Sequence, residues 1–515
     1  MDADLQSIQE ARTLAQKARA AQRVLAGFSQ EQVDRVVDAM AAAARAEAEP
    51  LARLAHEETG FGNVKDKTAK NLFAATEVHA YIKPLRTVGV LRENPATRVT
   101  EIAEPMGVVA AVIPSTNPTS TAIFKALVAI KARNAVVMSP HPSARRAFVE
   151  TARLLLKAAL AAGLPEGALA CMETVSLGGT QELMRGRDTG VILATGGIGL
   201  VRAAYSSGKP AYGVGPGNVP AYIEKTADVP QAARDVIAGK TFDFGTLCSS
   251  EQSIVCDEAV RDEVVAEVKK NGGHFLDAAE AKALARVAVT PERLANPEVV
   301  GRAAVVIAAL AGLKVPPETR ALVAPLTGVG RDHPLSIEKL CPILAFYVVK
   351  DSEEAGRRCL ELLRFGGTGH TVGIHSRDDK VIRDFAFKAP VFRVVVNTQT
   401  SMGATGYTTG LAPSMSLGCG AYAGNITSDN ITPLHLINVK RLAYGRPRAD
   451  AKGAAEPPAK ATPLAAAPPA LDFVCEDDVR RALREGRTLR LSARAIVTPS
   501  ARDAAAGKDI FVTEA

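Results

Sequence analysis

Short β-branched runs alternate with longer helical runs through most of this 515-residue chain. The runs "NAVVMSP" and "GVILATGG" lie among the helical stretches "TSTAIFKALVAIKAR" and "ARRAFVETARLLLKAALAAG". Strands that alternate with helices in this way pair in parallel, and the helices cover both faces of the sheet. The alternation therefore predicts an α/β protein built on a doubly wound, Rossmann-like sheet.

A second alternating region follows Cys248, so we expect more than one domain. Its strand candidates are "QSIVCD", "RAAVVIAAL", "PILAFYVV", "HTVGIHS" and "FRVVVNTQT". We expect N-terminal helices and a first domain over 1–238, with a β-hairpin or an extended arm near Val88–Ala103. A second domain over 239–425 and a returning strand over 426–445 complete this prediction.

The composition changes sharply after Arg446. Residues 446–470 are rich in Pro and Ala and carry no packing pattern, which is typical of a linker. Beyond them, three acidic residues at 476–478 precede several arginines and Gly486, which suits the two ends of a short helix. The segment 471–515 is therefore predicted to be a small separate module.

Composition argues against several classes of protein. The 62 basic and 55 acidic residues give a net charge of +7, but they are dispersed and no aromatic stacking platform accompanies them. We therefore expect no nucleic-acid partner. The seven cysteines are widely spaced without a CxxC, which indicates reduced thiols and no metal cluster. Since neither a signal peptide nor an apolar run of about 20 residues is visible, we expect a cytoplasmic protein without a membrane partner.

One cysteine, Cys248, stands behind a glycine and among small hydroxyl residues in "KTFDFGTLCSSEQSIV". Asn117, in "PSTNPTS", follows a strand and so lies at the sheet edge where such folds bind ligands. A cysteine can form a thioester, and an asparagine amide can donate a hydrogen bond to an oxyanion. A buried structural thiol and a turn residue are the alternatives, and taken singly they are the commoner ones.

Several long blocks resemble the aldehyde dehydrogenase family, and within it the CoA-acylating branch. They are "EPMGVVAAVIPSTNPTSTAIFKALVAIKARNAVVMSPHP", "VILATGGIGLVRAAYSSGKPAYGVGPGNVP", "TFDFGTLCSSEQSIV", "EKLCPILAFY" and "LAPSMSLGCGAYAGN". The resemblance implies the aldehyde dehydrogenase fold, with a cofactor-binding first domain, a catalytic second domain and an oligomerisation arm. It implies that Cys248 is the nucleophile and Asn117 an oxyanion donor, and that NAD takes hydride from the aldehyde adduct.

Hydrolytic relatives carry a Glu that activates water where this chain has "GVGPGN", Gly213–Asn218, which contains no carboxylate. A positioned base contributes roughly 10²–10⁴-fold, so attack by water should be slow here. A thiol needs less help, which favours coenzyme A as the acyl acceptor. The nearest acid, Glu251, is interpreted as a carboxylate in the first turn of a helix, and a catalytic role is the alternative.

The resemblance also implies where the cofactor binds. Its candidate contacts are Thr195, Gly196, Gly197, Ser139, Pro140, His141 and Glu338. His370, in "GGTGHTVGI", either lines the pocket or is structural.

The substrate pocket is expected to form beside the nucleophile, from Phe244, Thr246, Leu247 and Ser249. No Arg or Lys lies between Thr241 and Ser253, and an anionic substrate would need one close by. This favours a short apolar aldehyde, propionaldehyde or acetaldehyde.

The tail, 471–515, resembles extensions that direct enzymes into bacterial microcompartments, which implies shell proteins as partners. An unpacked tail with a nascent helix is the alternative. The arm resembles one through which relatives assemble, so a homodimer or tetramer is expected. Three rival functions remain: an acylating sulfoacetaldehyde dehydrogenase, an acyl-phosphate reductase, and a catalytically silent scaffold bound to a shell.

Overall fold

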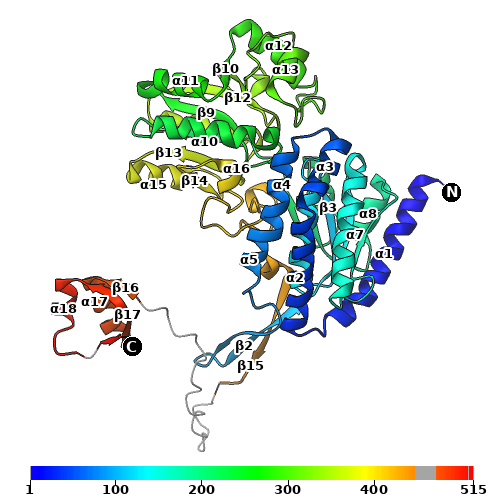
Figure 1. The fold of residues 1–515 in the computed structure, drawn as a ribbon, viewed down its shortest axis with the longest axis vertical. Helices are drawn as coiled ribbons and strands as arrows, with labels where there is room; N and C mark the ends of the chain where they lie inside the picture. The colour runs from blue at the N-terminus through cyan, green and yellow to red at the C-terminus, as the bar shows by residue number, and fades with distance from the viewer. Residues whose placement is uncertain (1, 447–470, 509, 514–515) are drawn as a thin grey trace, which may run out of the picture. The chain divides into compact units, whose positions relative to one another are not determined.

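The computed structural model describes residues 2–446, 471–508 and 510–513 (Figure 1). The chain divides into two compact units, Met1–Tyr444 and Gly445–Ala515. Residues 447–470 of the expected linker lie outside the described residues.

The Ala-rich start of the chain forms the predicted helices. They are α1 (Ala3–Leu25), α2 (Gln30–Ala46), α3 (Ala48–Thr59), α4 (Val64–Leu72) and α5 (His79–Ile82), with a π-helical turn at Phe73–Val78 before α5. Helix α1 buries Ala11, Ala15 and Ala18 at a spacing of three to four residues. Small side chains at this spacing let the helix pack closely against the domain beneath it.

The first sheet has five parallel strands in the order β5-β4-β3-β6-β7. These are β3 (Val108–Ile113), β4 (Ala135–Pro140), β5 (Leu169–Cys171), β6 (Thr189–Thr195) and β7 (Ala211–Val214). The connecting helices are α6 (Pro118–Lys131), α7 (Arg145–Ala161), α8 (Leu177–Arg185) and α9 (Ile198–Tyr205). Every residue of β3 and β4 is buried, as expected when helices cover both faces. The prediction of a doubly wound sheet is confirmed.

The second sheet has seven parallel strands in the order β10-β11-β12-β9-β8-β13-β14. They are β8 (Val219–Ile223), β9 (Glu251–Asp257), β10 (Gly273–Phe275), β11 (Ala321–Pro325), β12 (Ile343–Val349), β13 (Val372–His375) and β14 (Val394–Val396). Its helices are α10 (Val229–Thr241), α11 (Arg261–Lys270), α12 (Ala278–Ala288), α13 (Ala304–Leu310), α14 (Ser352–Gly366), α15 (Asp379–Lys388) and α16 (Thr400–Gly403).

Two features of this region differ from the expectation. The run "RAAVVIAAL", predicted as a strand, is helix α13, because Ala304, Ile307 and Ala308 pack on one face at helical spacing. The change between sheets also comes before the expected boundary at 238. Strand β8 already pairs with β9 and β13, since the chain crosses to the second sheet directly after β7.

The predicted hairpin arm is present in the first unit. Strands β1 (Gly89–Asn94) and β2 (Val99–Pro105) pair antiparallel, and the late strand β15 (Ile437–Ala443) pairs with β2. Figure 1 shows β2 and β15 side by side, extending from the helical body of this unit.

The second unit is a small α/β module. Strands β16 (Leu471–Val474), β17 (Leu489–Val497) and β18 (Phe511–Thr513) are parallel, and helices α17 (Glu476–Glu485) and α18 (Pro499–Ala504) connect them. Helix α17 begins and ends as predicted, with Gly486 in the left-handed region at φ 63°. The strands were not predicted. Across both units, we find no described helix with the length and apolarity needed to cross a bilayer.

Candidate active site

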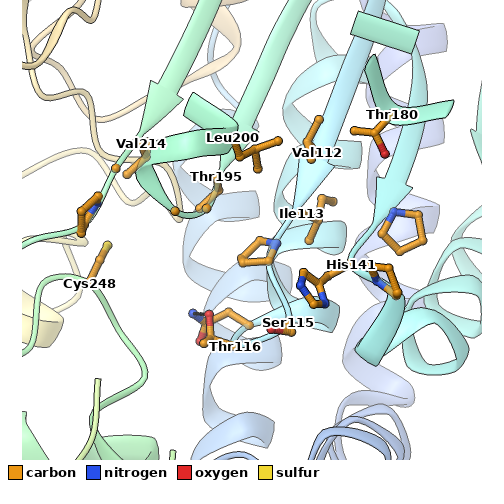
Figure 2. Close-up of a pocket in the computed structure, with 18 of the residues that line it drawn as sticks. Val112, Ile113, Ser115, Thr116, His141, Thr180, Thr195, Leu200, Val214 and Cys248 are labelled. Atoms are coloured by element: carbon orange, nitrogen blue, oxygen red, sulfur yellow. Dashed lines mark hydrogen bonds between the residues drawn. The ribbon is translucent and has the colours of Figure 1, made fainter. Parts of the chain in front are cut away.

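A cavity of about 520 Å³ lies where the two sheets of the first unit face each other. One wall comes from the carboxyl ends of β3, β4 and β6, the edge at which parallel sheets bind ligands. The opposite wall carries Cys248, Glu338 and Leu340. Figure 2 shows Cys248 across the cavity from His141 and Thr180.

Cys248 follows a sharp reversal of the chain. Asp243, Phe244 and Gly245 all have positive φ, at 46°, 52° and 76°, so the helical chain is redirected into the loop before β9. The thiol is partly buried. Burial raises the pKa of Cys248 to about 12, and Glu338 adds to this rise. The thiol is therefore protonated near neutral pH and must lose its proton before it can attack.

Asn117 is the N-cap of α6, but its side chain makes no capping bond. Its Nδ2 instead donates to the carbonyl oxygen of Thr246 at 3.2 Å and to Thr116 Oγ1 at 3.1 Å. All 14 residues of α6 are buried, so the helix holds Asn117 on a rigid base. The amide therefore lies in the cavity beside the segment that carries Cys248.

The loop Gly213–Asn218 passes directly beside Cys248. A Cβ atom on Gly217 would lie 2.2 Å from the carbonyl oxygen of Cys248 and 3.0 Å from the His370 ring. The loop itself holds no carboxylate, yet Glu338 Oε1 accepts a hydrogen bond from the backbone of Gly217 at 2.7 Å. Burial raises the pKa of Glu338 to about 7.

His370 is fully buried beside this loop, next to Gly217. Its Nδ1 lies 3.0 Å from Thr371 Oγ1, and its Nε2 has no hydrogen-bond partner within the described part of the chain. Burial, together with a smaller effect of nearby Arg393, lowers the pKa of His370 to about 3. The imidazole is therefore neutral at working pH.

The wall formed by the carboxyl ends of the strands fits a dinucleotide. Thr195, Gly196, Gly197, Pro140 and His141 all line the cavity. The buried Oγ1 of Thr195 has no hydrogen-bond partner among the described residues, and helix α9 begins after Gly197 without a side-chain cap. Free amides at a helix N-terminus suit a pyrophosphate. As far as the chain is described, no cluster of three or more His, Cys, Asp or Glu could hold a metal ion.

The family model described as "Aldehyde dehydrogenase family" matches residues 2–418. The chain belongs to the aldehyde dehydrogenase family. An acetylating aldehyde dehydrogenase from Geobacillus thermoglucosidasius has a solved structure similar to this chain, with TM-score 0.86 and 52% identity, covering 87% of this chain and 99% of that one.

Two curated relatives are also similar to this family member. The bifunctional aldehyde-alcohol dehydrogenase AdhE of Escherichia coli is 42% identical over 85% of this chain and 50% of its own length. The acetylating succinate-semialdehyde dehydrogenase of Clostridium kluyveri is 38% identical over 84% of this chain and 95% of its own length. The chain thus spans about half the length of AdhE.

Several residues expected at the site of this aldehyde dehydrogenase lie elsewhere. Ser139 is buried behind the wall, with its hydroxyl 2.8 Å from Thr180 Oγ1. Of the expected substrate residues only Thr246 lines the cavity with Cys248. Phe244 lines a separate cavity of about 650 Å³, Leu247 is buried, and Ser249 donates to the carbonyl of Ser401 at 3.0 Å. Consecutive residues of a loop point in different directions, which spacing alone could not resolve.

The interpretation of Glu251 as a helical carboxylate is wrong. Glu251 is the first residue of strand β9 and is fully buried. Its Oε1 accepts a hydrogen bond from the backbone of Thr400 at 2.5 Å, and burial raises its pKa to about 7. Pairing with Val219 of β8 extends the strand to this residue, and the carboxylate accepts from the first backbone N–H of α16.

Sequence reasoning also missed the cations beside Asn117. Lys67 and Lys70 lie three residues apart on α4, and both are buried. A pair at this spacing shares one helix face, but exposed lysines show the same pattern. The signal was therefore too weak to single them out.

Proposed function

We propose that the protein is an NAD-dependent, CoA-acylating aldehyde dehydrogenase. It converts a short aliphatic aldehyde, propionaldehyde or acetaldehyde, to the acyl-CoA through a thioester on Cys248. One observation carries the proposal: Cys248 and Asn117 line the same cavity as the Thr195–Gly197 loop. A nucleophile, an oxyanion donor and a dinucleotide site thereby meet in one place.

The roles follow from the chemistry of these groups. The sulfur of Cys248, after loss of its proton, attacks the carbonyl carbon, and the amide of Asn117 donates a hydrogen bond to the oxygen that becomes negative. NAD, when bound, supplies the acceptor for the hydride that leaves the carbon. Thr195 and the amides after Gly196 would hold its pyrophosphate, and Glu338 would hold its nicotinamide ribose. The acyl group remains on Cys248 until a second thiol replaces it.

Coenzyme A rather than water is the proposed acceptor. The loop beside Cys248 carries no carboxylate, and the nearby Glu338 binds the backbone of Gly217. His370 is neutral and fully buried, and it is not among the described residues that line the cavity with Cys248. Among the described residues, neither group is therefore placed to serve water as a base at the acyl carbon, whereas a thiol needs less activation.

The lining of the cavity supports an uncharged substrate. In the part of the chain that the structure describes, none of its lining residues is Lys or Arg. A sulfonate or carboxylate would call for such a partner. The competing substrate is sulfoacetaldehyde, and turnover of propionaldehyde, acetaldehyde and sulfoacetaldehyde at equal concentration decides between them.

The test of the proposed activity is NADH formation with aldehyde, with and without coenzyme A. We expect sustained NADH and acyl-CoA only when coenzyme A is present, and neither from Cys248→Ala. Steady release of free acid without coenzyme A would contradict the proposal. Phosphate replacing coenzyme A would support an acyl-phosphate reductase, and no NADH under any condition would support a silent scaffold.

We also propose that the arm joins copies of the chain into a homodimer or tetramer. Six of the seven residues of β15 are exposed, including the apolar Val439 and Leu442. Light scattering of the wild type and of Val439→Asp/Leu442→Asp tests this. We expect two or four copies for the wild type and fewer for the variant, and a monomeric wild type would contradict the proposal.

The second unit is proposed to dock on shell proteins, which would place the enzyme inside a microcompartment of the cytoplasm. Its own apolar core supports an independent module, with Val474, Val479, Leu489 and Ala501 among its members. We expect the full chain to concentrate in shells and a chain ending at Arg446 to stay diffuse. Equal distribution of the two would contradict docking.

A further inference from the structure

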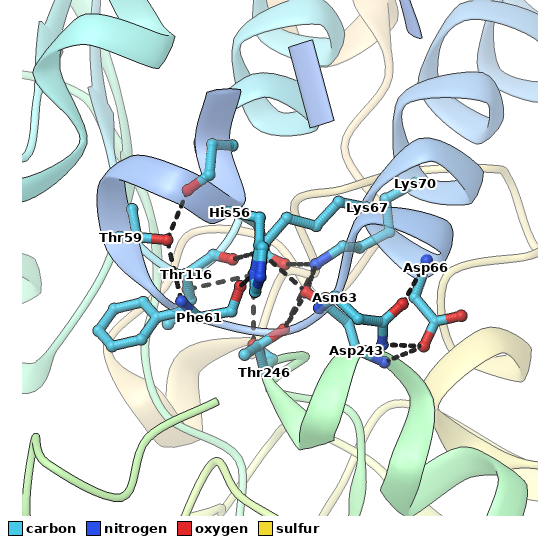
Figure 3. A network of polar contacts seen from close by, with 12 residues as sticks. His56, Thr59, Phe61, Asn63, Asp66, Lys67, Lys70, Thr116, Asp243 and Thr246 are labelled. Carbon is cyan, nitrogen blue, oxygen red and sulfur yellow. Dashed lines mark hydrogen bonds and ion pairs between the residues drawn. The ribbon is translucent and has the colours of Figure 1, made fainter. Parts of the chain in front are cut away.

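A buried cluster of charges joins the N-terminal helices to the turn before Cys248. Lys67 and Lys70 come from α4, and Asp243 comes from the turn (Figure 3). Their side chains are only 2%, 3% and 0% exposed. Three ionisable groups buried together need close pairing, because an isolated charge in the interior is costly.

Asp243 is the centre of this cluster. Its Oδ2 accepts from Lys67 Nζ at 3.1 Å, from Thr246 Oγ1 at 2.7 Å, and from Lys70 Nζ in a short contact. Its Oδ1 accepts from the backbone of Asn63 at 2.9 Å. The carboxylate thus fixes the left-handed turn from which the chain continues to Cys248.

Only one of the two lysines also reaches Asn117. Lys70 Nζ donates to Asn117 Oδ1 at 2.5 Å and to Thr246 Oγ1 at 3.3 Å. Lys67 Nζ donates instead to the carbonyl of Thr116 at 3.2 Å, and no bond to Asn117 is found among the described contacts. The lysines therefore share a carboxylate and differ in their contact with the amide.

An ammonium group has three donors and no acceptor, so it bonds the oxygen of an amide and never its NH₂. With Oδ1 of Asn117 held by Lys70, Nδ2 must point the other way, toward Thr246 and the cavity. A cation on the amide oxygen also draws electron density from the N–H bonds, which makes Nδ2 a stronger donor.

We propose that Lys70 is a positioning residue for the reaction, acting through Asn117. It holds the amide in the one orientation that presents Nδ2 to the aldehyde oxygen, and it polarises that donor. Lys70 itself does not touch the substrate. The inference rests on the proposed function, because Asn117 matters in this way only if an oxyanion forms beside Cys248.

A double-mutant cycle tests the inference. Removing an oxyanion donor costs roughly 10²–10³-fold in kcat, so we expect a loss of this size for Asn117→Ala. Lys70→Met should lower kcat at least tenfold with little change in the KM for NAD. In the Asn117→Ala background Lys70→Met should have no further effect, because the group through which it acts is gone. Multiplication of the two losses would overturn the inference.

Lys67→Met is the matched control. Like Lys70→Met, it removes one positive charge that pairs with Asp243, but it leaves the hydrogen bond between Lys70 and Asn117 in place. We therefore expect kcat to change less than threefold. Lys70→Gln should recover at least tenfold over Lys70→Met, because its amide can still donate to Asn117 Oδ1. Equal losses from Lys67→Met and Lys70→Met, or no recovery with Lys70→Gln, would indicate a merely structural role.

Circular dichroism and thermal unfolding of each variant show whether it folds. If Lys70→Met does not fold, the cycle is run with Lys70→Gln, whose smaller loss should also vanish in the Asn117→Ala background. A wild type that never oxidises aldehyde would remove the proposed function itself. An active wild type with multiplicative losses would remove only the role of Lys70.

Discussion

Gly217 offers the sharpest prediction about the geometry of the site. A methyl group added there would lie 2.2 Å from the carbonyl oxygen of Cys248, whereas ordinary contact begins at 3.4 Å. Either the loop or the segment that carries Cys248 must then move by about 1.2 Å. A misplacement of about 1 Å in a catalytic group can cost about 10²-fold in rate. We therefore expect Gly217→Ala to lower kcat by about two orders of magnitude.

The cost in stability should be smaller, since overpacking typically destabilises a protein by about 1–3 kcal/mol. Gly356→Ala is the control, because a Cβ there meets nothing within 4 Å in the described structure and Gly356 lies in α14, outside the lining of the cavity. NADH formation at saturating aldehyde and coenzyme A gives kcat for both variants, and thermal unfolding confirms that they fold. Wild-type kcat in Gly217→Ala, or equal losses in both variants, would refute the argument.

Three further predictions follow from buried charges. Because burial raises the pKa of Cys248 to about 12, its alkylation by iodoacetamide should accelerate about tenfold per pH unit from pH 7 to 10, and a plateau below pH 9 would contradict this. Asp243→Asn leaves Lys67 and Lys70 buried without their carboxylate, so the free energy of unfolding should fall by about 3–5 kcal/mol, which chemical denaturation measures. The pKa of Glu338 is raised from 4.5 to about 7, so the folded state binds more protons between these values. The Tm of the wild type relative to Glu338→Gln should therefore fall as pH rises from 4.5 to 7, and a constant difference would contradict the shift.

The fold could be predicted from the sequence where helical and strand-like runs differ clearly in length and pattern. Strands β3 and β4 are continuous apolar runs bounded by helices, and they were predicted. The run that forms α13 holds Val, Val and Ile in succession, which favours a strand. The run forms a helix because one of its faces packs against other elements, and these elements lie in distant parts of the chain.

The residues of the candidate site also divide into those that the sequence could predict and those that it could not. Cys248 and Asn117 could be predicted because each stands in a distinctive local stretch, and the structure brings both to one cavity. Lys70 could not, because it lies 47 positions from Asn117 and 173 from Asp243. Contacts between residues so far apart in the chain cannot be predicted from the local spacing of residues in the sequence. Phe244 and Ser249 were expected to point into the pocket beside Cys248, and neither lines it. The left-handed turn before Cys248 sets the directions of these side chains, and local spacing does not predict such a turn.

Mass spectrometry of the peptide that carries Cys248 tests the central claim most directly. Enzyme quenched after mixing with aldehyde and NAD, without coenzyme A, should carry one acyl group on this sulfur. Coenzyme A should then remove the group within a turnover, while water removes it far more slowly. No adduct on this peptide, or its equally fast loss without coenzyme A, would contradict the account.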